Sequence, residues 1–306
     1  MKKMIIAAGT GFLGTVITSY FKSKVEEIVI LTRGTSNTID NIRHVHWDAR
    51  TIGSWISELE NADVLINMTG KSVDCRYTKK NKELILKSRT ESTGILHNAL
   101  QQCIHPPKVW LNSSTATIYR HSLNKEMDEV QGEYGTGFSV AVAKAWETAF
   151  FKSSIPNVRK VALRTSIVLG KNGGALRPIV NLVKIGMGGR QGSGKQKFSW
   201  IHEIDFARSI EYIITQTAID GTVNIVAPKP VTNAKLMQQL QKTLRRPFGI
   251  PLPKFLLEIG ARIIQTETEL IIKSRNVVPK KLIDHGFQFN YATLDIALQD
   301  LTTKKT

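Results

Sequence analysis

The sequence has few cysteines and no long apolar run, and each shortage excludes a class of protein. Cys75 and Cys103 are the only cysteines in 306 residues, which indicates a reducing compartment and argues against a disulfide framework or a metal site. No apolar run approaches the roughly 20 residues that cross a bilayer. The stretch Met4–Ala8 resembles the start of a signal peptide, but it is short and runs directly into glycines. We therefore predict a cytoplasmic protein that does not enter a membrane.

Acidic residues are scarce relative to basic ones. The chain has 25 Asp and Glu against 42 Lys and Arg, a formal net charge of +17. This balance favours an anionic partner, either a nucleic acid, a membrane surface or a small ligand. The basic residues are spread along the chain without a nucleic-acid-binding motif, so we expect a small-molecule substrate and no specific nucleic acid. The sequence leaves a homodimer open.

The first half alternates short apolar runs with helical stretches. Predicted strands are Met4–Ala8, Glu27–Thr32, His44–Trp47, Ala62–Met68, Lys108–Ser113 and Val158–Leu169, and predicted helices are Phe12–Lys22, Lys79–Gln102 and Phe138–Lys152. This order predicts an α/β fold with a Rossmann-type doubly wound parallel sheet and a smaller C-terminal substrate-side domain.

The predicted domain boundaries follow from the same pattern. Residues 1–170 form the dinucleotide-binding domain, joined by a strand at 221–227. Segments 171–220 and 228–247 lie on the substrate side, and 248–301 form the small C-terminal domain, which begins with a helix over Phe255–Ser274.

The strongest motif is a glycine-rich turn between the first strand and the first helix. It reads Gly9, Thr10, Gly11, Phe12, Leu13 and Gly14. In this context one glycine makes the tight turn, one admits a pyrophosphate to the backbone and one lets the helix pack on the strand. The free amides at the helix start then face the phosphates. We predict a dinucleotide site here; a glycine turn without a ligand is the alternative.

The end of the second strand indicates which dinucleotide is bound. An acidic residue at this place holds a ribose hydroxyl, whereas a basic one accommodates a 2′-phosphate. The chain reads Thr32-Arg33-Gly34 and has no acid there. We therefore predict NADP(H) in preference to NAD(H), with Arg33 on the phosphate. An ordinary solvated arginine is the alternative.

Several segments together resemble a known family. They are AGTGFLG, LTR, INMTG, RYTKKNKELILKSR, SSTATIY, LRTSIVLG, GGRQGSGKQKFSWIHEIDFA and VVPKKLIDHGFQFNYATLDIALQDL. The chain resembles the extended and atypical short-chain dehydrogenase/reductase superfamily, and within it the epimerase-family branch that carries a small extra C-terminal domain. The resemblance covers nearly the whole chain. It implies an NAD(P) cofactor in a Rossmann domain and a substrate cleft roofed by C-terminal segments.

Two positions depart from the superfamily pattern. The glycine motif is usually read from a glycine where this chain has Ala8. The larger departure concerns the Tyr-x-x-x-Lys pair, whose tyrosine moves a proton while a hydride moves to or from the nicotinamide. Here Ser139 stands at the tyrosine position and Ala143 at the lysine position. Lys144 lies one residue further, about 100° around a helix, so the ordinary relay is absent.

Other residues are candidates for the site. By the resemblance, Thr115 best matches the family's catalytic hydroxyl, with Ser114 and Tyr119 as further catalytic candidates. The alternative is that these strand-end hydroxyls cap backbone groups. Additional cofactor contacts expected from the resemblance are Asn67, Gly70, Ser113 and Arg164.

Substrate contacts are expected at Arg76, Arg89, Gly192, Gln196 and His202. The two arginines indicate an anionic substrate, whereas a structural role is the alternative for His202. Phe198 stands where nucleotide-sugar enzymes often place an arginine, which lowers the expectation of a nucleotide sugar. Two functions remain open: an NADP(H)-dependent epimerase-like or oxidoreductase-like enzyme, which we favour, and a non-catalytic NADP(H)-binding sensor or scaffold.

Overall fold

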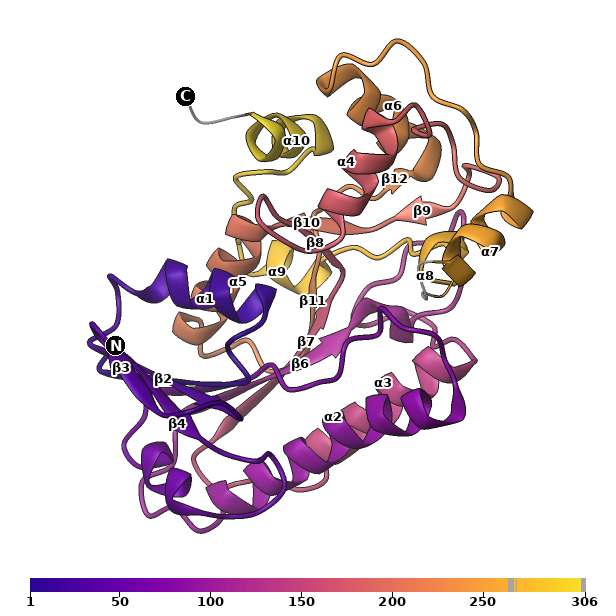
Figure 1. Ribbon diagram of the computed structural model, residues 1–306. Coiled ribbons are helices and arrows are strands. Elements are labelled where there is room, and N and C mark those ends of the chain that lie inside the picture. The colour runs from indigo at the N-terminus through magenta and orange to yellow at the C-terminus, as the bar shows by residue number, and fades with distance from the viewer. Residues whose placement is uncertain (264–266, 268, 304–306) are drawn as a thin grey trace.

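A computed structural model describes residues 1–263, 267 and 269–303 and contains a central sheet of eight strands in the order β11-β7-β6-β5-β1-β2-β4-β3 (Figure 1). The strands are β1 (Lys3–Ala7), β2 (Glu27–Thr32), β3 (Asn37–Ile39), β4 (Ile42–His46), β5 (Val64–Asn67), β6 (Val109–Thr115), β7 (Arg159–Thr165) and β11 (Gly221–Ile225). Neighbouring strands pair in parallel except β3, which runs antiparallel to β4. This is the doubly wound Rossmann-type sheet that the sequence predicts.

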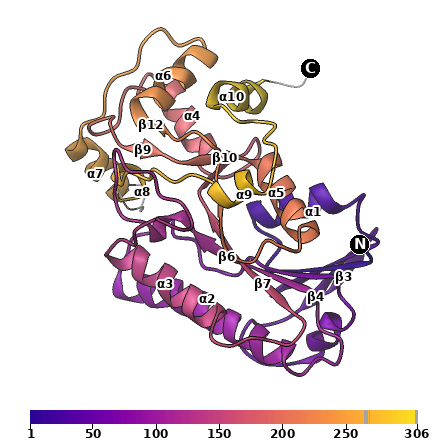
Figure 2. The same cartoon turned by 180° about the vertical axis from the view of Figure 1, so that it is seen from behind.

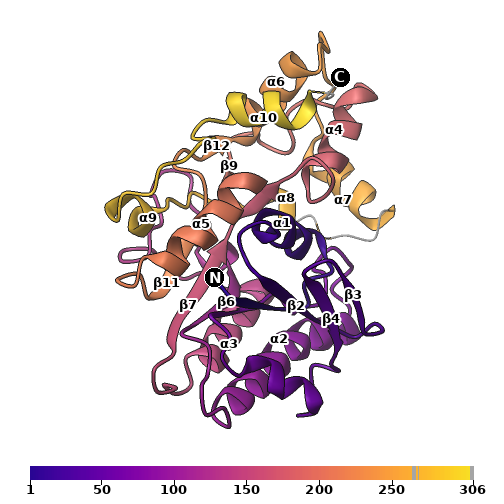
Figure 3. The same ribbon diagram turned by 90° about the vertical axis from the view of Figure 1, so that its left-hand side faces the viewer.

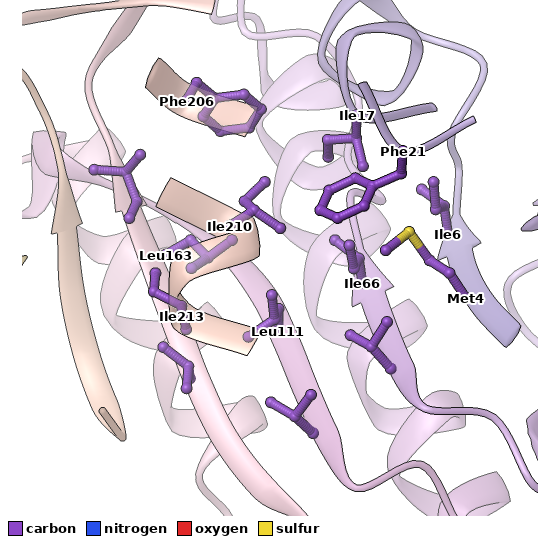
Figure 4. Packing of buried hydrophobic residues seen from close by; sticks show 14 of the residues in the cluster. Met4, Ile6, Ile17, Phe21, Ile66, Leu111, Leu163, Phe206, Ile210 and Ile213 are labelled. Atoms are coloured by element: carbon purple, nitrogen blue, oxygen red, sulfur yellow. The ribbon is translucent and has the colours of Figure 1, made fainter. Parts of the chain in front are cut away.

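Helices cover both faces of the sheet. Helices α1 (Phe12–Phe21) and α5 (Glu203–Thr215) lie on one face, and α2 (Lys79–Leu100) and α3 (Phe138–Phe150) on the other (Figure 3). Figure 4 shows Phe21 of α1 and Phe206 of α5 directed at the sheet, above Ile6, Ile66 and Leu111. Each fully buried side chain of this size stabilises the fold by about 1.5–3 kcal/mol.

A second, smaller body continues from the end of β7 (Figure 2). Its short strands pair as β8 (Ile167–Leu169) with β10 (Trp200–His202) and β9 (Lys197–Phe198) with β12 (Val231–Thr232). Helices α4 (Leu176–Lys184), α6 (Asn233–Thr243) and α10 (Leu294–Thr302) enclose an apolar cluster around these strands.

The last part of the chain differs from the sequence prediction. One helix was expected over Phe255–Ser274, but the structure has α7 (Lys254–Ile263) and α8 (Glu269–Ile272), while 264–266 and 268 lie outside the described residues. A further short helix, α9 (Lys280–Asp284), packs beside β11. Among the described residues, none of the helices combines the length and hydropathy needed to cross a membrane.

Candidate functional site

The glycines between β1 and α1 have different surroundings. A Cβ on Gly14 would lie 2.3 Å from the carbonyl oxygen of Gly9, so α1 packs tightly on the turn. A Cβ on Gly11 would meet no protein atom within 4 Å. Gly11 is the N-cap of α1, and no side chain caps this helix. Amides at the positive end of the helix dipole are therefore open to an anion, as phosphate binding requires.

An outer cavity of about 470 Å³ lies beside this turn. Its lining residues are Ala8, Thr10, Thr32, Arg33, Gly34, Trp47, Ala49 and Thr69. They come from the ends of β1, β2, β4 and β5. Arg33 is exposed at the rim, and no acidic side chain is among the lining residues.

A central cavity of about 260 Å³ lies across the ends of β5, β6 and β7. Its lining residues include Leu13, Met68, Thr69, Gly70, Tyr77, Arg89, Ser113, Ser114, Thr115, Phe138, Ser139, Trp146 and Thr165. Thr69 lines both cavities, which therefore adjoin, and we call the two together the groove. The groove crosses the carboxyl ends of the strands on both sides of β1, where doubly wound sheets bind their ligands.

Two buried hydroxyls of this groove have no hydrogen-bond partner among the described residues. They are Oγ1 of Thr69 and Oγ of Ser139. A buried polar atom without a partner costs about 1–3 kcal/mol, which a bound ligand offsets by supplying one. The open amides of α1 and these hydroxyls fit an elongated polar ligand with a phosphate group near Gly11.

Three hydroxyls at the end of β6 reach the central cavity. Ser113 donates to Sδ of Met68 at 3.0 Å, and Ser114 donates to the Glu147 carboxylate at 2.6 Å. Thr115 accepts the backbone N–H of Thr117 at 3.1 Å and thereby caps a short 3-10 turn. Thr115 is thus both a backbone cap and a lining residue of the cavity, whereas Ser113 and Ser114 line the cavity and bond side chains.

Arg89 brings a positive charge to the central cavity. Its Nη1 donates to the backbone carbonyls of Lys71 and Ile85, and its guanidinium lies 5.0 Å from the Trp146 ring. No carboxylate pairs with it among the described residues. Burial lowers the pKa of Arg89 to about 10, because a buried cation without a counter-ion is disfavoured. A negatively charged ligand group would compensate this charge.

Comparison with known proteins agrees with this geometry. A family model described as NAD dependent epimerase/dehydratase family matches residues 4–226. The chain belongs to this family. A second model, a domain of unknown function (DUF1731), matches residues 252–301.

Relatives match over almost their full length. Epimerase family protein YfhF of Bacillus subtilis is 32% identical, over 97% of this chain and 96% of the relative. Epimerase family protein SDR39U1 of Mus musculus is 30% identical, over 98% and 99%. The crystal structure of human SDR39U1 (isoform2) with NADPH superposes with a TM-score of 0.86, at 27% identity and 98% coverage of both chains. The description of the matched family and the NADPH in the human structure both support a nicotinamide cofactor.

The family's glycine motif explains a strained residue in this chain. Ala8, at the first motif position, has φ +59°. This left-handed conformation costs an alanine roughly 1–2 kcal/mol and a glycine little. The backbone therefore keeps the conformation for which the usual glycine is suited.

Helix α3 is where the family carries its Tyr-x-x-x-Lys pair. Ser139 lines the central cavity, whereas Ala143 is completely buried. Lys144 is exposed, with Nζ 5.4 Å from the Tyr134 ring. The one-residue offset thus places this lysine outside the cavity.

Tyr119 and Arg164 correct two predictions. The Tyr119 hydroxyl donates to Asn224 and accepts from Arg164, it is buried, and burial raises its pKa to about 12. Arg164 is 2% exposed and also bonds both carboxylate oxygens of Glu147. Burial opposes this charge, but the Glu147 bonds outweigh it and raise the pKa of Arg164. Neither residue lines the groove, so Tyr119 is no proton donor to it and Arg164 no cofactor contact.

Asn67 and Arg76 also act differently from the prediction. Asn67 is completely buried and bonds Thr93, Asn112 and the N–H of Thr69, so it positions Thr69 rather than lining the groove. Arg76 pairs with Glu267 at 3.4 Å and lines neither cavity. Of the two arginines expected at the substrate, only Arg89 reaches the central cavity.

Three further substrate predictions fall outside the groove. His202 caps α5 through Nδ1 and stacks on Tyr291 at 3.6 Å, which supports its structural alternative. Gln196 donates to the Gln191 carbonyl, and the Gly192 amide donates to Leu252. Both are used to hold the loop, and none of the three residues is among those that line the central or the outer cavity.

Sequence reasoning missed several residues that line the groove, among them Thr69, Tyr77, Phe138 and Trp146. Thr69 follows β5, and Phe138 and Trp146 lie on α3. The periodicity of the sequence does not show that these residues lie among the polar residues of a cavity. Tyr77 precedes α2 in a loop. The one sequence signal for Tyr77 was its place directly after Arg76, in a segment that carries the family resemblance.

Proposed function

We propose that the protein binds NADP(H) and acts as an oxidoreductase-like or epimerase-like enzyme on a small anionic substrate. The observation that carries this proposal is the pair of adjoining cavities, with the open α1 turn beside the outer one and the Arg89 guanidinium in the central one. The dinucleotide, when bound, supplies hydride chemistry at its nicotinamide. The crystallised NADPH complex of the human relative supports the same cofactor.

The proposed preference for NADP(H) over NAD(H) depends on Arg33. It lines the outer cavity beside Thr32 and Gly34, where no acidic group competes for it. A guanidinium there pairs with a 2′-phosphate, and such charged hydrogen bonds contribute about 1.5–3 kcal/mol.

Fluorescence titrations with NADPH and NADH test this assignment. Arg33→Ala lowers NADPH affinity about 10- to 100-fold and leaves NADH affinity unchanged. Arg50→Ala is the matched control, because Arg50 is exposed nearby but lines neither cavity. Equal affinities for both cofactors, unaltered by Arg33→Ala, would reject the preference.

The substrate end of the groove favours a small anion. Arg89 has one buried charge to neutralise, and the central cavity, about 260 Å³, must also hold a nicotinamide ring. The hydroxyls of Ser114 and Thr115 lie on the same wall and can orient a substrate oxygen. This arrangement supports a compact carboxylate-bearing compound better than a nucleotide sugar.

A non-catalytic NADP(H)-binding sensor or scaffold is the second candidate. The α3 helix favours it, because Ser139, Ala143 and an outward Lys144 replace the usual proton relay. Prolonged incubation with NADPH and a panel of small carbonyl acids separates the two. Oxidation of NADPH above background supports the enzyme, whereas tight cofactor binding without turnover supports the sensor.

A further inference from the structure

Tyr77 places a phenol in the central cavity at the position that α3 leaves without one. Its ring packs edge-on against Phe138, 4.9 Å between centroids. Its hydroxyl lies close enough to Ser139 for that residue to lower the phenol's pKa, though without a fully formed hydrogen bond. Ser139 stands at the family's tyrosine position. A phenol from the loop before α2 therefore occupies the space in front of it.

The charges around Tyr77 suit a proton donor. Burial raises the pKa of Tyr77, an effect that Ser139 partly offsets, so the phenol is protonated at neutral pH. The guanidinium groups of Arg89 and Arg275 lie within electrostatic range of its oxygen. Glu269 and Glu267 raise the pKa of Tyr77 and so keep the proton on the phenol, whereas the two guanidinium groups favour the phenolate that forms once the proton has left.

The loop that carries Tyr77 is held from the C-terminal part of the chain. The backbone N–H of Tyr77 donates to Glu267 at 2.7 Å, and Arg76 pairs with the same carboxylate. Thr78 then caps α2 by accepting the N–H of Asn81. The residue is thus fixed on both sides, which keeps its hydroxyl in the cavity.

We propose that Tyr77 is the catalytic proton donor, acting on the carbonyl oxygen of a small 2-oxo carboxylate whose carboxylate pairs with Arg89. In the reductive direction a hydride with its two electrons passes from NADPH to the carbonyl carbon. The carbonyl π bond breaks, and the oxygen takes the Tyr77 proton. The products are a 2-hydroxy carboxylate and NADP⁺, and solvent reprotonates the phenolate. The inference rests on the proposed function and names the substrate class and proton donor of that same site.

The test uses the full chain loaded with NADP⁺ and pyruvate as the probe. Calorimetry measures pyruvate binding, and isotope-edited infrared spectroscopy measures the carbonyl stretch of the bound probe. Pyruvamide is the neutral control ligand. The variants are Tyr77→Phe and Arg89→Gln, with Tyr212→Phe as a control that removes a phenol bonded to the His285 carbonyl, away from the groove.

We expect Tyr77→Phe to bind pyruvate within about threefold of wild type but to shift the carbonyl stretch to higher frequency, because a hydrogen bond to that oxygen is lost. Single-turnover reduction with NADPH should fall at least ~100-fold. An unchanged stretch and an unchanged rate in Tyr77→Phe overturn the inference about Tyr77.

The Arg89→Gln variant tells this failure apart from failure of the proposed function. It should weaken pyruvate binding more than ~10-fold and leave pyruvamide binding unchanged. If wild type does not bind pyruvate, or binds both probes equally, the anionic-substrate proposal and the Tyr77 inference both fall. If Tyr77→Phe changes neither the carbonyl stretch nor the reduction rate while Arg89→Gln behaves as expected, only the Tyr77 inference falls and the proposed function stands.

Discussion

Two alanine substitutions in the glycine turn separate cofactor binding from folding. Gly11→Ala places a methyl group where no protein atom lies within 4 Å, on a backbone at φ −83° and ψ 176° that any residue adopts. Gly14→Ala places one 2.3 Å from the Gly9 carbonyl oxygen and 2.4 Å from its carbon. The first methyl enters the space left for the pyrophosphate, whereas the second enters the protein.

The magnitudes follow from these distances. Carbon–oxygen contacts are ordinarily no closer than about 3.3 Å, so Gly14→Ala forces α1 and the turn apart by about 1 Å. Such a gap forfeits roughly a quarter to a half of each dispersion contact across it, and overpacking alone costs about 1–3 kcal/mol. We expect Gly14→Ala to lose about 3 kcal/mol of unfolding free energy. Gly11→Ala should change it by less than about 0.5 kcal/mol.

The two substitutions rank in the opposite order for their direct effect on NADPH binding. Gly11→Ala should weaken NADPH binding about 10- to 100-fold, or about 1.4–2.7 kcal/mol, by keeping the phosphates from the amides. Urea unfolding measures the stability and NADPH fluorescence the affinity. The cradle hypothesis is refuted if the folded Gly11→Ala protein binds NADPH as wild type does. An equal loss of stability in both variants would also contradict the geometry.

Three further predictions use other parts of the structure. Ala8→Gly relieves the left-handed strain and should change the urea-unfolding free energy by 0 to about +1 kcal/mol; a loss above about 1 kcal/mol contradicts it. Burial lowers the pKa of His202, whose Nδ1 caps α5, so protonation of this nitrogen breaks the cap. The unfolding free energy should therefore fall as the pH drops below about 6.5, by up to ~1.4 kcal/mol per pH unit. His202→Asn should keep a cap and flatten this slope, and an unchanged slope in thermal melts refutes the assignment. Glu267→Ala should slow single-turnover reduction of pyruvate at least ~10-fold with NADPH affinity within about threefold, whereas a comparable loss of NADPH affinity would contradict a role confined to the Tyr77 loop.

The fold was predictable because its strands are buried on both faces. Runs such as Glu27–Thr32 have no polar side, which identifies a sheet covered by helices on both faces. The antiparallel strand Asn37–Ile39 escaped prediction because it is short and fully exposed, so no burial pattern marks it.

The position of the site was predictable from the sequence, but the residues that line it were predictable only in part. Strand ends meet at one edge, but successive side chains point to opposite faces. Asn67 is two residues from Leu65 and shares its face toward α2, and Arg164 shares that of Ala162 toward α3. The alternation of side chains along a strand, followed from these apolar residues, would have placed both side chains on the helix-covered face. Tyr77 was beyond such reasoning, because Glu267, 190 residues away in the chain, fixes its loop.

This long-range contact gives the C-terminal region a physical role. The region matched by the domain of unknown function contributes several bonds to loops near the central cavity. Glu267 holds Tyr77, Ser274 donates to the Ser122 carbonyl at 2.6 Å, and the Arg275 Nε donates to Thr117 at 3.3 Å. The Rossmann part supplies the cradle, the hydroxyls of β6 and the Phe138 ring against Tyr77, whereas the bond to the Tyr77 backbone N–H comes from Glu267. Removing the C-terminal contacts should therefore disturb the substrate end of the groove before the cofactor end, because the α1 cradle makes none of them.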